Sequence, residues 1–251
     1  MPQDAPTAAM LVIGNEILSG RTQDKNVVHV AKRMSNLGVR LMEVRVVPDV
    51  RDRIVTAVQE LSSTWDYLVT TGGIGPTHDD ITTECVAAAM GVEVERNAEA
   101  HRRLRAHYAG TEIELNEARL RMANIPVGAT LIDNPVSSAP GFRLGNVFVL
   151  AGVPAIMQAM LAVLEPQLVR GPPLRSHTFV VHRPEGAIAE TLATVATEFA
   201  DVDIGSYPFY RPPDIGTSLV LRAVDPDRLT LCADAVRRFL TQLGAPFREE
   251  A

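Results

Sequence analysis

Residues 67–86 read YLVTTGGIGPTHDDITTECV: an apolar run, then a loop with three glycines and a proline, then a helix-like pattern. A loop that leaves a strand and enters a helix directs free amide groups towards the positive end of that helix, where a phosphate is stabilised. Glycines let the backbone approach such a ligand without a side chain in between. We therefore interpret the stretch as a phosphate-binding loop with the contact residues Gly72, Gly73, Gly75, Pro76 and Thr77.

Two adjacent carboxylates, Asp79 and Asp80, end this loop. A carboxylate beside a phosphate is repulsive unless a cation lies between them, and a hard divalent cation binds both kinds of oxygen. The alternative is that Asp80 caps the following helix, because aspartate is a preferred N-terminal residue of helices. The loop has neither the Gly-Lys-Ser/Thr of a Walker motif nor the G-x-G-x-x-G pattern, so these standard motifs do not explain it.

The composition is that of an ordinary globular protein, with 46% hydrophobic and 22% charged residues in a chain of 251. No apolar stretch approaches the length of a membrane span, and the first ten residues lack the basic region of a signal peptide, so we expect a cytoplasmic protein with no membrane partner. A net charge of −6 argues against nucleic acid as a partner. Cys85 and Cys232 are far apart in the sequence, and we expect buried thiols.

Strands and helices alternate as far as residue 168. Apolar runs predict strands at 8–14, 67–71, 129–132 and 147–150, and alternation predicts one at 39–47. Periodic apolar positions predict helices between them. This alternation predicts an α/β domain with a mostly parallel sheet and helices on both faces, which is a three-layer α/β/α arrangement. Ligands of such folds bind at the carboxyl ends of the strands, where the glycine-rich loop begins.

A change in composition divides the chain at RGPP, residues 170–173, which is typical of a linker. Beyond it the pattern predicts elements in the order βαββα, which is a small α+β domain. We therefore expect two domains, residues 1–170 and 171–251.

Several ordered motifs carry a resemblance to a known family. They are GNEILSG (14–20), DKN (24–26), VVPD (46–49), TTGGIGPTHDDIT (70–82), NPVSSAPGF (134–142) and LAGVPAIM (150–157). In this order and spacing they resemble the molybdopterin-binding (MoaB/MogA-like) domain of molybdenum-cofactor biosynthesis proteins. The closer similarity is to the CinA (competence/damage-inducible protein A) family and to the corresponding domain of some FAD synthases.

The resemblance implies a domain that binds molybdopterin or a nucleotide at the strand ends. For CinA-like members it implies a metal-dependent pyrophosphatase that cleaves ADP-ribose, and for the FAD synthase relatives one that cleaves FAD. It also implies a divalent cation, Mg²⁺ or a transition metal, and a homo-oligomer. Two other functions stay open: a module that binds molybdopterin or a nucleotide without turnover, and adenylyl transfer to molybdopterin.

Carried over by position, the resemblance implies catalytic and metal-binding roles for Asp49 and Asp80, and Asp79 favours hydrolysis over adenylyl transfer. Read alone, Asp49 could equally cap a helix. Glu16, at the end of the first strand, is a further candidate metal ligand. The remaining predicted substrate-binding residues are Asn26, after DK, and Ser137, Ser138 and Gly141, in a second small-residue loop.

Three positions depart from the family pattern, and they put catalytic competence in doubt. Ser137 stands where glycine is common, Ala151 replaces a common proline, and Ile156 replaces a common glutamate. Loss of that glutamate could remove a metal ligand or a neighbour of one, which favours the non-catalytic module.

Overall fold

The computed structural model describes residues 5–211 and 214–250. They form two compact units, Ala5–Gly171 and the residues from Pro172 onward. No helix in the described part of the chain is both long enough and apolar enough to cross a membrane.

The first unit contains a six-stranded sheet with the strand order β2-β1-β3-β8-β7-β6. The strands are β1 (Thr7–Ile13), β2 (Arg40–Val47), β3 (Tyr67–Thr71), β6 (Thr130–Ile132), β7 (Gly141–Leu144) and β8 (Val147–Leu150), and β4 (Val94–Arg96) and β5 (Asn124–Pro126) form a separate pair. The helices are α1 (Asn15–Leu18), α2 (Asn26–Asn36), α3 (Arg51–Thr64), α4 (Thr82–Met90), α5 (Ala98–Tyr108), α6 (Glu117–Leu120), α7 (Pro154–Leu164) and the short 3-10 helices η1 (Arg121–Ala123) and η2 (Glu165–Gln167).

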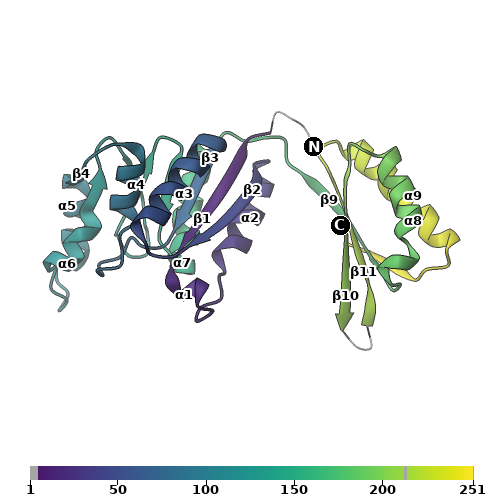
Figure 1. Cartoon of the computed structure of the whole chain (residues 1–251), viewed down its shortest axis with the longest axis horizontal. Coiled ribbons are helices and arrows are strands. Elements are labelled where there is room, and N and C mark those ends of the chain that lie inside the picture. Colours follow the sequence, from purple (N-terminus) through teal and green to yellow (C-terminus); the bar gives the residue numbers. More distant parts are fainter. Residues whose placement is uncertain (1–4, 212–213, 251) are drawn as a thin grey trace. The chain divides into compact units, whose positions relative to one another are not determined.

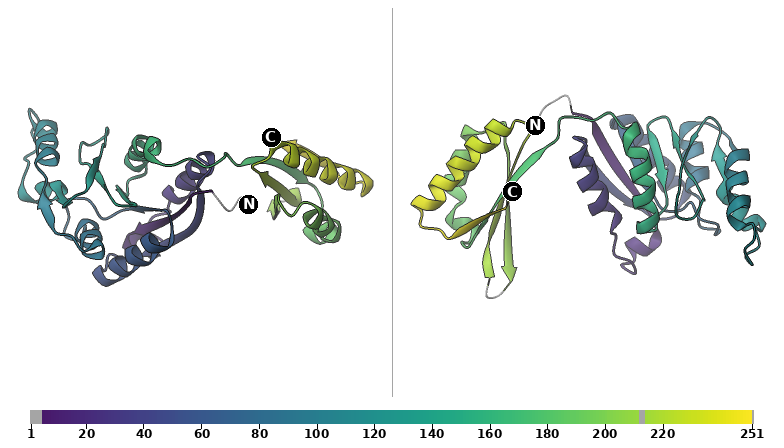
Figure 2. Two further views of the ribbon diagram at one scale, coloured as in Figure 1. Left: turned by 90° about the horizontal axis from the view of Figure 1, so that it is seen from above. Right: turned by 180° about the vertical axis from the view of Figure 1, so that it is seen from behind.

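Helices cover both faces of this sheet, which confirms the predicted three-layer α/β fold. On one face, Leu11 and Leu68 pack with Ile54 of α3 and Val86 of α4. Side chains from β1, β3 and β8 pack on the other face with α2 and α7. Figure 1 shows α3 in front of the sheet, and the view from behind in Figure 2 shows α2 and α7. The alternating strand residues thus bury both sheet faces, as a mostly parallel sheet requires.

The sheet also contains elements that the sequence did not reveal. β2, β1, β3 and β8 are parallel, as predicted, but β7 is antiparallel to both of its neighbours, β6 and β8. The sequence also predicts a helical stretch at about 98–123 with a break near Gly110, and the structure divides this stretch into α5, α6 and η1. The additions are short elements, whose apolar periodicity is weak over so few residues.

The second unit is a four-stranded antiparallel sheet with two helices against one face. Its elements are β9 (Arg175–Val181), η3 (Glu185–Ala187), α8 (Ala189–Glu198), β10 (Asp203–Arg211), β11 (Asp214–Ala223), α9 (Pro226–Gln242) and β12 (Phe247–Glu250). The strand order is β10-β11-β9-β12. Phe179 and Leu219 of the sheet pack against Leu192 and Val236 of the helices. The α+β character is therefore as predicted, with the terminal strand β12 added.

Both cysteines are buried and unpaired, as expected. Burial raises the pKa of each thiol, Cys85 and Cys232, to about 11. Neither thiol is therefore a reactive thiolate near neutral pH.

Candidate functional site

The site lies at the carboxyl edge of the six-stranded sheet, between β1 and β3, where the connections that follow these two strands go to opposite faces of the sheet. The helix after β1, α2, covers one face of the sheet, and the helix after β3, α4, covers the other. Neighbouring parallel strands whose connections go to opposite faces leave a crevice between their carboxyl ends, and this is the usual ligand position in open α/β sheets.

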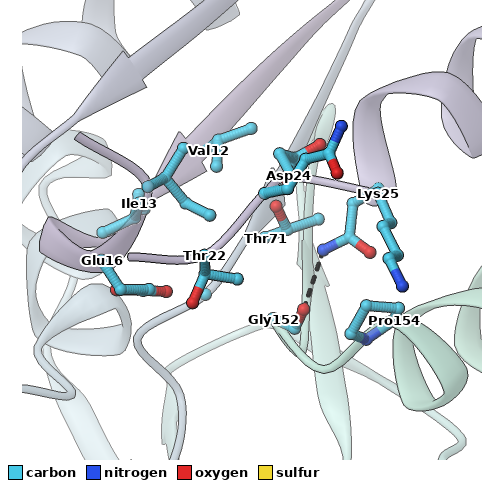
Figure 3. A pocket seen from close by; sticks show the side chains of 13 residues that line it. Val12, Ile13, Glu16, Thr22, Asp24, Lys25, Thr71, Gly152 and Pro154 are labelled. Carbon is cyan, nitrogen blue, oxygen red and sulfur yellow. Dashed lines mark hydrogen bonds between the residues drawn. The ribbon is translucent and has the colours of Figure 1, made fainter. Parts of the chain in front are cut away.

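A pocket lies at this crevice, and we call it the switch pocket. Its lining residues are Val12, Ile13, Glu16, Ile17, Thr22, Gln23, Asp24, Lys25, Asn26, Thr71, Gly72, Gly152 and Pro154. Its volume is about 340 Å³ with the open mouth included. Figure 3 shows Thr71 between Glu16 and Thr22 on one side and Lys25 and Pro154 on the other. The pocket also lies at the N-termini of α2 and α7.

Two buried polar atoms in the switch pocket have no hydrogen-bond partner in the described structure: Oδ1 of Asn26 and Oγ1 of Thr71. The residues are only 4% and 1% exposed. Nδ2 of Asn26 donates to the carbonyl of Gly152 at 2.8 Å, which fixes the amide orientation and leaves Oδ1 as the unused acceptor. Buried polar groups without partners are rare, so these two atoms indicate a place for a ligand or a water.

The glycine-rich loop, residues 72–80, lies beside the switch pocket and shares Gly72 with it. In contrast to the pocket, this loop is closed by its own hydrogen bonds. Oδ2 of Asp80 accepts the backbone amide of Thr77 at 2.8 Å and the Thr77 hydroxyl at 2.5 Å. The buried hydroxyl of Thr82 donates to the carbonyl of Gly72, and the Thr82 amide donates to the carbonyl of Gly73. The loop is thus fastened to the first turn of α4.

One of the sequence interpretations of this loop needs correction. Asp80 does not cap α4, because α4 has no side-chain cap bond and the carboxylate turns back to Thr77 instead. Gly73 packs closely against the start of α4, since a Cβ atom there would lie 2.2 Å from Oγ1 of Thr82. The glycine is required by packing and by its φ of +66°.

The other two glycines of the loop are also required by close approach. A Cβ atom at Gly72 would lie 2.1 Å from the Ile13 carbonyl oxygen, and one at Gly75 would lie 2.6 Å from Oδ2 of Asp80. Pro76 and the exposed Thr77 continue the loop. Asp79 is exposed, and the Thr77 hydroxyl next to it, followed by the Asp79 amide, lowers the pKa of its carboxyl. Asp79 is therefore charged near neutral pH.

Arg121 is a site residue that the sequence analysis missed. It comes from η1, and its guanidinium donates to the carbonyls of Thr77, at 2.9 Å, and Asp80, at 3.2 Å. Glu84 of α4 lies 3.7 Å away. The side chain thus holds the end of the glycine-rich loop and places a positive charge beside it. No sequence signal points to this residue, because it is one of several arginines in a polar stretch.

Asp49 and Glu16 meet at the loop after β1. Oδ2 of Asp49 accepts the amide of Asn15 at 2.8 Å, and Glu16 follows Asn15 and lines the switch pocket. The helix-cap alternative for Asp49 is wrong, because α3 begins at Arg51 without a side-chain cap bond. Both carboxylates therefore lie at the carboxyl ends of β1 and β2, at the predicted sheet edge.

The loop between β6 and β7 contains the predicted residues Ser137 and Ser138, and it too is closed internally. The buried Asn134 accepts the amides of Val136 and Ser137 and donates to the Ser137 hydroxyl and the Ala139 carbonyl. Ser138 has a φ of 60°. Asn134 was not among the predicted site residues, although asparagine is common in tight turns because its side chain bonds to the nearby backbone.

Gly141 is not a loop residue, which corrects the prediction for it. It is the first residue of β7 and is buried, and a Cβ atom there would lie 2.2 Å from the Val149 carbonyl oxygen. The glycine is therefore needed for sheet packing. Ser137 and Ser138 lie at the same sheet edge as the switch pocket, because β6 runs parallel to β8, but they do not line it.

The predicted metal ligands do not form a metal site by themselves. Among residues 5–211 and 214–250, no three His, Cys, Asp or Glu side chains are grouped to hold a cation. The hydrogen bonds above occupy only Oδ2 of Asp49 and of Asp80. Mg²⁺ commonly binds through one or two carboxylates together with substrate phosphates, and this donor set suits such shared binding.

Comparison with known proteins places the first unit in a family. Residues 9–170 match the model of the "probable molybdopterin binding domain". The chain belongs to this family. The assignment made from the motifs at 14–20 and 70–82 is thereby confirmed. Residues 173–245 match a second model, "FAD synthase, middle domain".

Proteins of other organisms are similar to this chain over most of their length. A protein of Caldivirga maquilingensis is 38% identical over 203 residues, which are 79% of this chain and 78% of the relative. One from Pyrobaculum calidifontis is 38% identical over 212 residues, 81% of either chain. Among solved structures, CinA from Thermoplasma acidophilum, described as of unknown function, is 34% identical with a TM-score of 0.61. The similarity covers 65% of this chain and 98% of that CinA.

Proposed function

We propose that the chain hydrolyses the pyrophosphate bond of a dinucleotide such as ADP-ribose or FAD. The observation that carries the proposal is the switch pocket, in which Asn26 and Thr71 present unpartnered buried oxygens directly beside the glycine-rich loop. An acceptor such as Oδ1 of Asn26 suits a hydroxyl or amino group of a ligand. The loop and the N-termini of α2 and α7 suit phosphates.

A single ligand that fits both the switch pocket and the glycine-rich loop carries phosphates next to a hydroxylated or amino-substituted group. Gly72 belongs to both the pocket and the loop, so the phosphates and that group lie close together in the ligand. Nucleotides have this composition, and so does molybdopterin, with its phosphate and its ring amino group. The family membership supports a ligand of the same class.

In the proposed reaction, water attacks one phosphorus of the pyrophosphate. A bond forms between the water oxygen and that phosphorus, and the bond from phosphorus to the bridging oxygen breaks. ADP-ribose would yield AMP and ribose 5-phosphate. A free carboxylate oxygen of Asp49 or Asp80 would take the proton of the water, with Asp79 as a third charged group at the loop. Amides of the rigid loop would hold the phosphate oxygens.

Glu16, Asp49 and Asp80 would hold a divalent cation together with the substrate phosphates, and that cation would neutralise their charge. The second candidate is a module that binds molybdopterin or a nucleotide without turnover. It is favoured by the lack of a three-carboxylate group in the described residues. It is also favoured by Ile156 near the start of α7, because this isoleucine replaces a glutamate that is common in the family.

A product assay separates the two candidates. The full chain is incubated with ADP-ribose, FAD, NAD or ATP and a series of divalent cations, and release of AMP is measured beside equilibrium binding. We expect AMP from ADP-ribose or FAD. Binding without AMP would favour the module, and an absence of binding to all four compounds would contradict both candidates.

Asp80→Asn sharpens this assay. An asparagine oxygen can still accept the two bonds from Thr77, so the loop and the thermal stability should be retained. The charge is lost, so turnover should fall at least about 100-fold while nucleotide binding weakens only moderately. Turnover equal to that of the wild type would remove Asp80 from the proposed catalytic residues.

A further inference from the structure

β2 forms an open edge of the six-stranded sheet (Figure 1). It pairs with β1 on one side, and no described strand pairs with its other side. The strand is eight residues long, and an edge strand of this length offers a row of free amides and carbonyls to another strand. Charges, bulges, prolines or a covering element protect many such edges. β2 carries charges and a register shift but no proline, and three of its apolar side chains stay exposed, which favours a partner strand.

The unpaired edge of β2 is apolar on one face. Val44 and Val46 lie on the α2 side of the sheet, opposite Met10 and Val12 of β1, yet they are 39% and 37% exposed. Met42, at the register shift, is 48% exposed. The backbone carbonyl of Val47 points to β1, where it accepts the Gly14 amide at 3.2 Å. With the period of two in a strand, the amides and carbonyls of Val44 and Val46 point outward.

The charges on the opposite face of β2 are self-complementary. Glu43 and Arg45 lie on the α3 side, one on each side of Val44, and both are about one third exposed. Within one chain Arg45 pairs with Glu43 at 2.8 Å and with Glu60 at 2.5 Å, so pairing across two copies would share these partners. If two copies of β2 run antiparallel with Val44 opposite Val44, each Glu43 faces Arg45 of the other copy. Val46 then faces Met42. Opposite charges and apolar pairs directly across two strands both stabilise the pairing.

We propose that β2 pairs with β2 of a second copy of this chain, antiparallel and centred on Val44, so that two six-stranded sheets become one continuous sheet. A two-fold interface places the same patch of each copy against itself, which the alternation of Met42, Glu43, Val44, Arg45 and Val46 allows. This homodimer does not depend on the proposed hydrolysis, because the interface residues do not line the switch pocket.

The oligomeric state of the full chain tests the interface. Sedimentation equilibrium is measured from about 1 to about 100 µM, because mass action makes a dimer dependent on concentration. We expect a dimer for the wild type and a monomer for Val44→Lys, in which two ammonium groups would face each other. Val127→Lys is the matched control: Val127 is similarly exposed, at 43%, but follows β5, and this variant should remain a dimer.

Disulfide formation tests the register and does not require a destabilising charge. In the proposed pairing, Val44→Cys brings two thiols into opposite positions, within the about 7 Å between Cα atoms that a disulfide spans. Val46→Cys is the control, because its two copies would be four residues apart along the strand, or about 13 Å. We expect mild oxidation to cross-link Val44→Cys alone. The native cysteines are buried and should not contribute.

Three results would overturn the proposal. These are a monomeric wild type over the whole concentration range, a dimer that Val44→Lys leaves intact, and cross-linking of Val46→Cys in preference to Val44→Cys. The first would show that the β2 edge does not bind a second copy. The second and third would place the dimer contact elsewhere on the surface or in another register.

Discussion

The glycine-rich loop and the switch pocket lie side by side and share Gly72, but their hydrogen bonding is opposite. In the loop, Asp80, Thr77 and Thr82 bond to one another or to the loop backbone. In the pocket, Asn26 and Thr71 each keep a buried oxygen without a partner in the described structure. The glycine-rich loop, which has the most recognisable sequence of the site, is therefore the part whose side chains already have hydrogen-bond partners.

The difference indicates a division of labour within the site. A loop held by its own bonds has fixed amide directions before a ligand arrives, so little reorganisation is needed when it binds. An unpartnered buried oxygen lowers the stability of the free protein, and a ligand that supplies a donor removes this cost. The loop would thus hold the amide groups in fixed directions, and the pocket would add favourable binding free energy when its buried oxygens gain a partner.

The largest expected effect comes from breaking the loop at its shared residue. Gly72→Ala places a Cβ atom 2.1 Å from the Ile13 carbonyl oxygen, a backbone atom that cannot rotate away, at a φ of +102°. We expect the free energy of unfolding to fall by about 3–4 kcal/mol and ligand binding to be lost. Chemical denaturation and calorimetric titration with ADP-ribose measure the two effects.

Gly91→Ala is the matched control for this substitution. Gly91 also has a positive φ, +70°, but a Cβ atom there meets nothing within 4 Å. Only the backbone strain remains, so we expect a loss of about 1 kcal/mol and unchanged binding. If Gly72→Ala costs no more than Gly91→Ala, the close approach of the loop to β1 is not rigid, and the contrast with the pocket fails.

A smaller effect is expected at Arg121, which ties the end of the loop to η1. Arg121→Met removes the donors to the carbonyls of Thr77 and Asp80 and keeps much of the side-chain length. We expect the unfolding free energy to fall by about 1 kcal/mol, because the side chain is partly exposed, and the amides of residues 77–81 to exchange faster with deuterium. Hydrogen exchange read out by mass spectrometry gives this measurement.

Arg119→Met is the control, since Arg119 donates to the carbonyl of Glu114 in the same polar stretch. It should leave exchange at 77–81 unchanged. Equal exchange in the two variants would show that the loop holds its shape without Arg121, by the bonds of Asp80 and Thr82 alone.

The fold was predictable where the pattern was long. The runs at 8–14 and 67–71 gave β1 and β3, because buried parallel strands are almost continuously apolar. The alternation at 39–47 gave the edge strand β2. β7 (GFRL) and β12 (FREE) lack the continuous apolar run that revealed the equally short β8 (VFVL), and four positions are too few to show a period. The strand directions of β6 to β8 also depend on tertiary pairing, which no local pattern reports.

The candidate site was predictable in part. Glu16, Asn26 and Gly72 were assigned from their places after strands and line one pocket. Gly141 was misassigned because small residues mark close packing in a strand as well as a ligand loop. Arg121 could not be found, since it contacts Thr77 across 44 positions of sequence. Thr71 had a usable signal, because two adjacent hydroxyl residues ending a buried apolar strand are unusual.

The smallest expected change in stability is at Thr71, and it has the opposite sign. Thr71→Val replaces an unpartnered hydroxyl by a methyl group of similar size, in a residue that is 1% exposed. The free energy of unfolding should therefore rise, by up to about 1 kcal/mol. If a ligand group bonds to this hydroxyl, affinity for ADP-ribose or FAD should fall about tenfold, which corresponds to about 1.4 kcal/mol.

Thr70→Val separates stability from binding. The Thr70 hydroxyl is also buried without a partner in the described structure, but Thr70 points to the α3 face and does not line the switch pocket. The same gain in stability is expected there because the same kind of group is removed, and affinity should stay at the wild-type value because no ligand reaches it. Denaturation and titration of the two variants in parallel therefore test the pocket against a neighbour of equal chemistry. Equal affinity in the two variants would mean that the ligand does not bond to the Thr71 hydroxyl. A bound water would then be the partner of this hydroxyl.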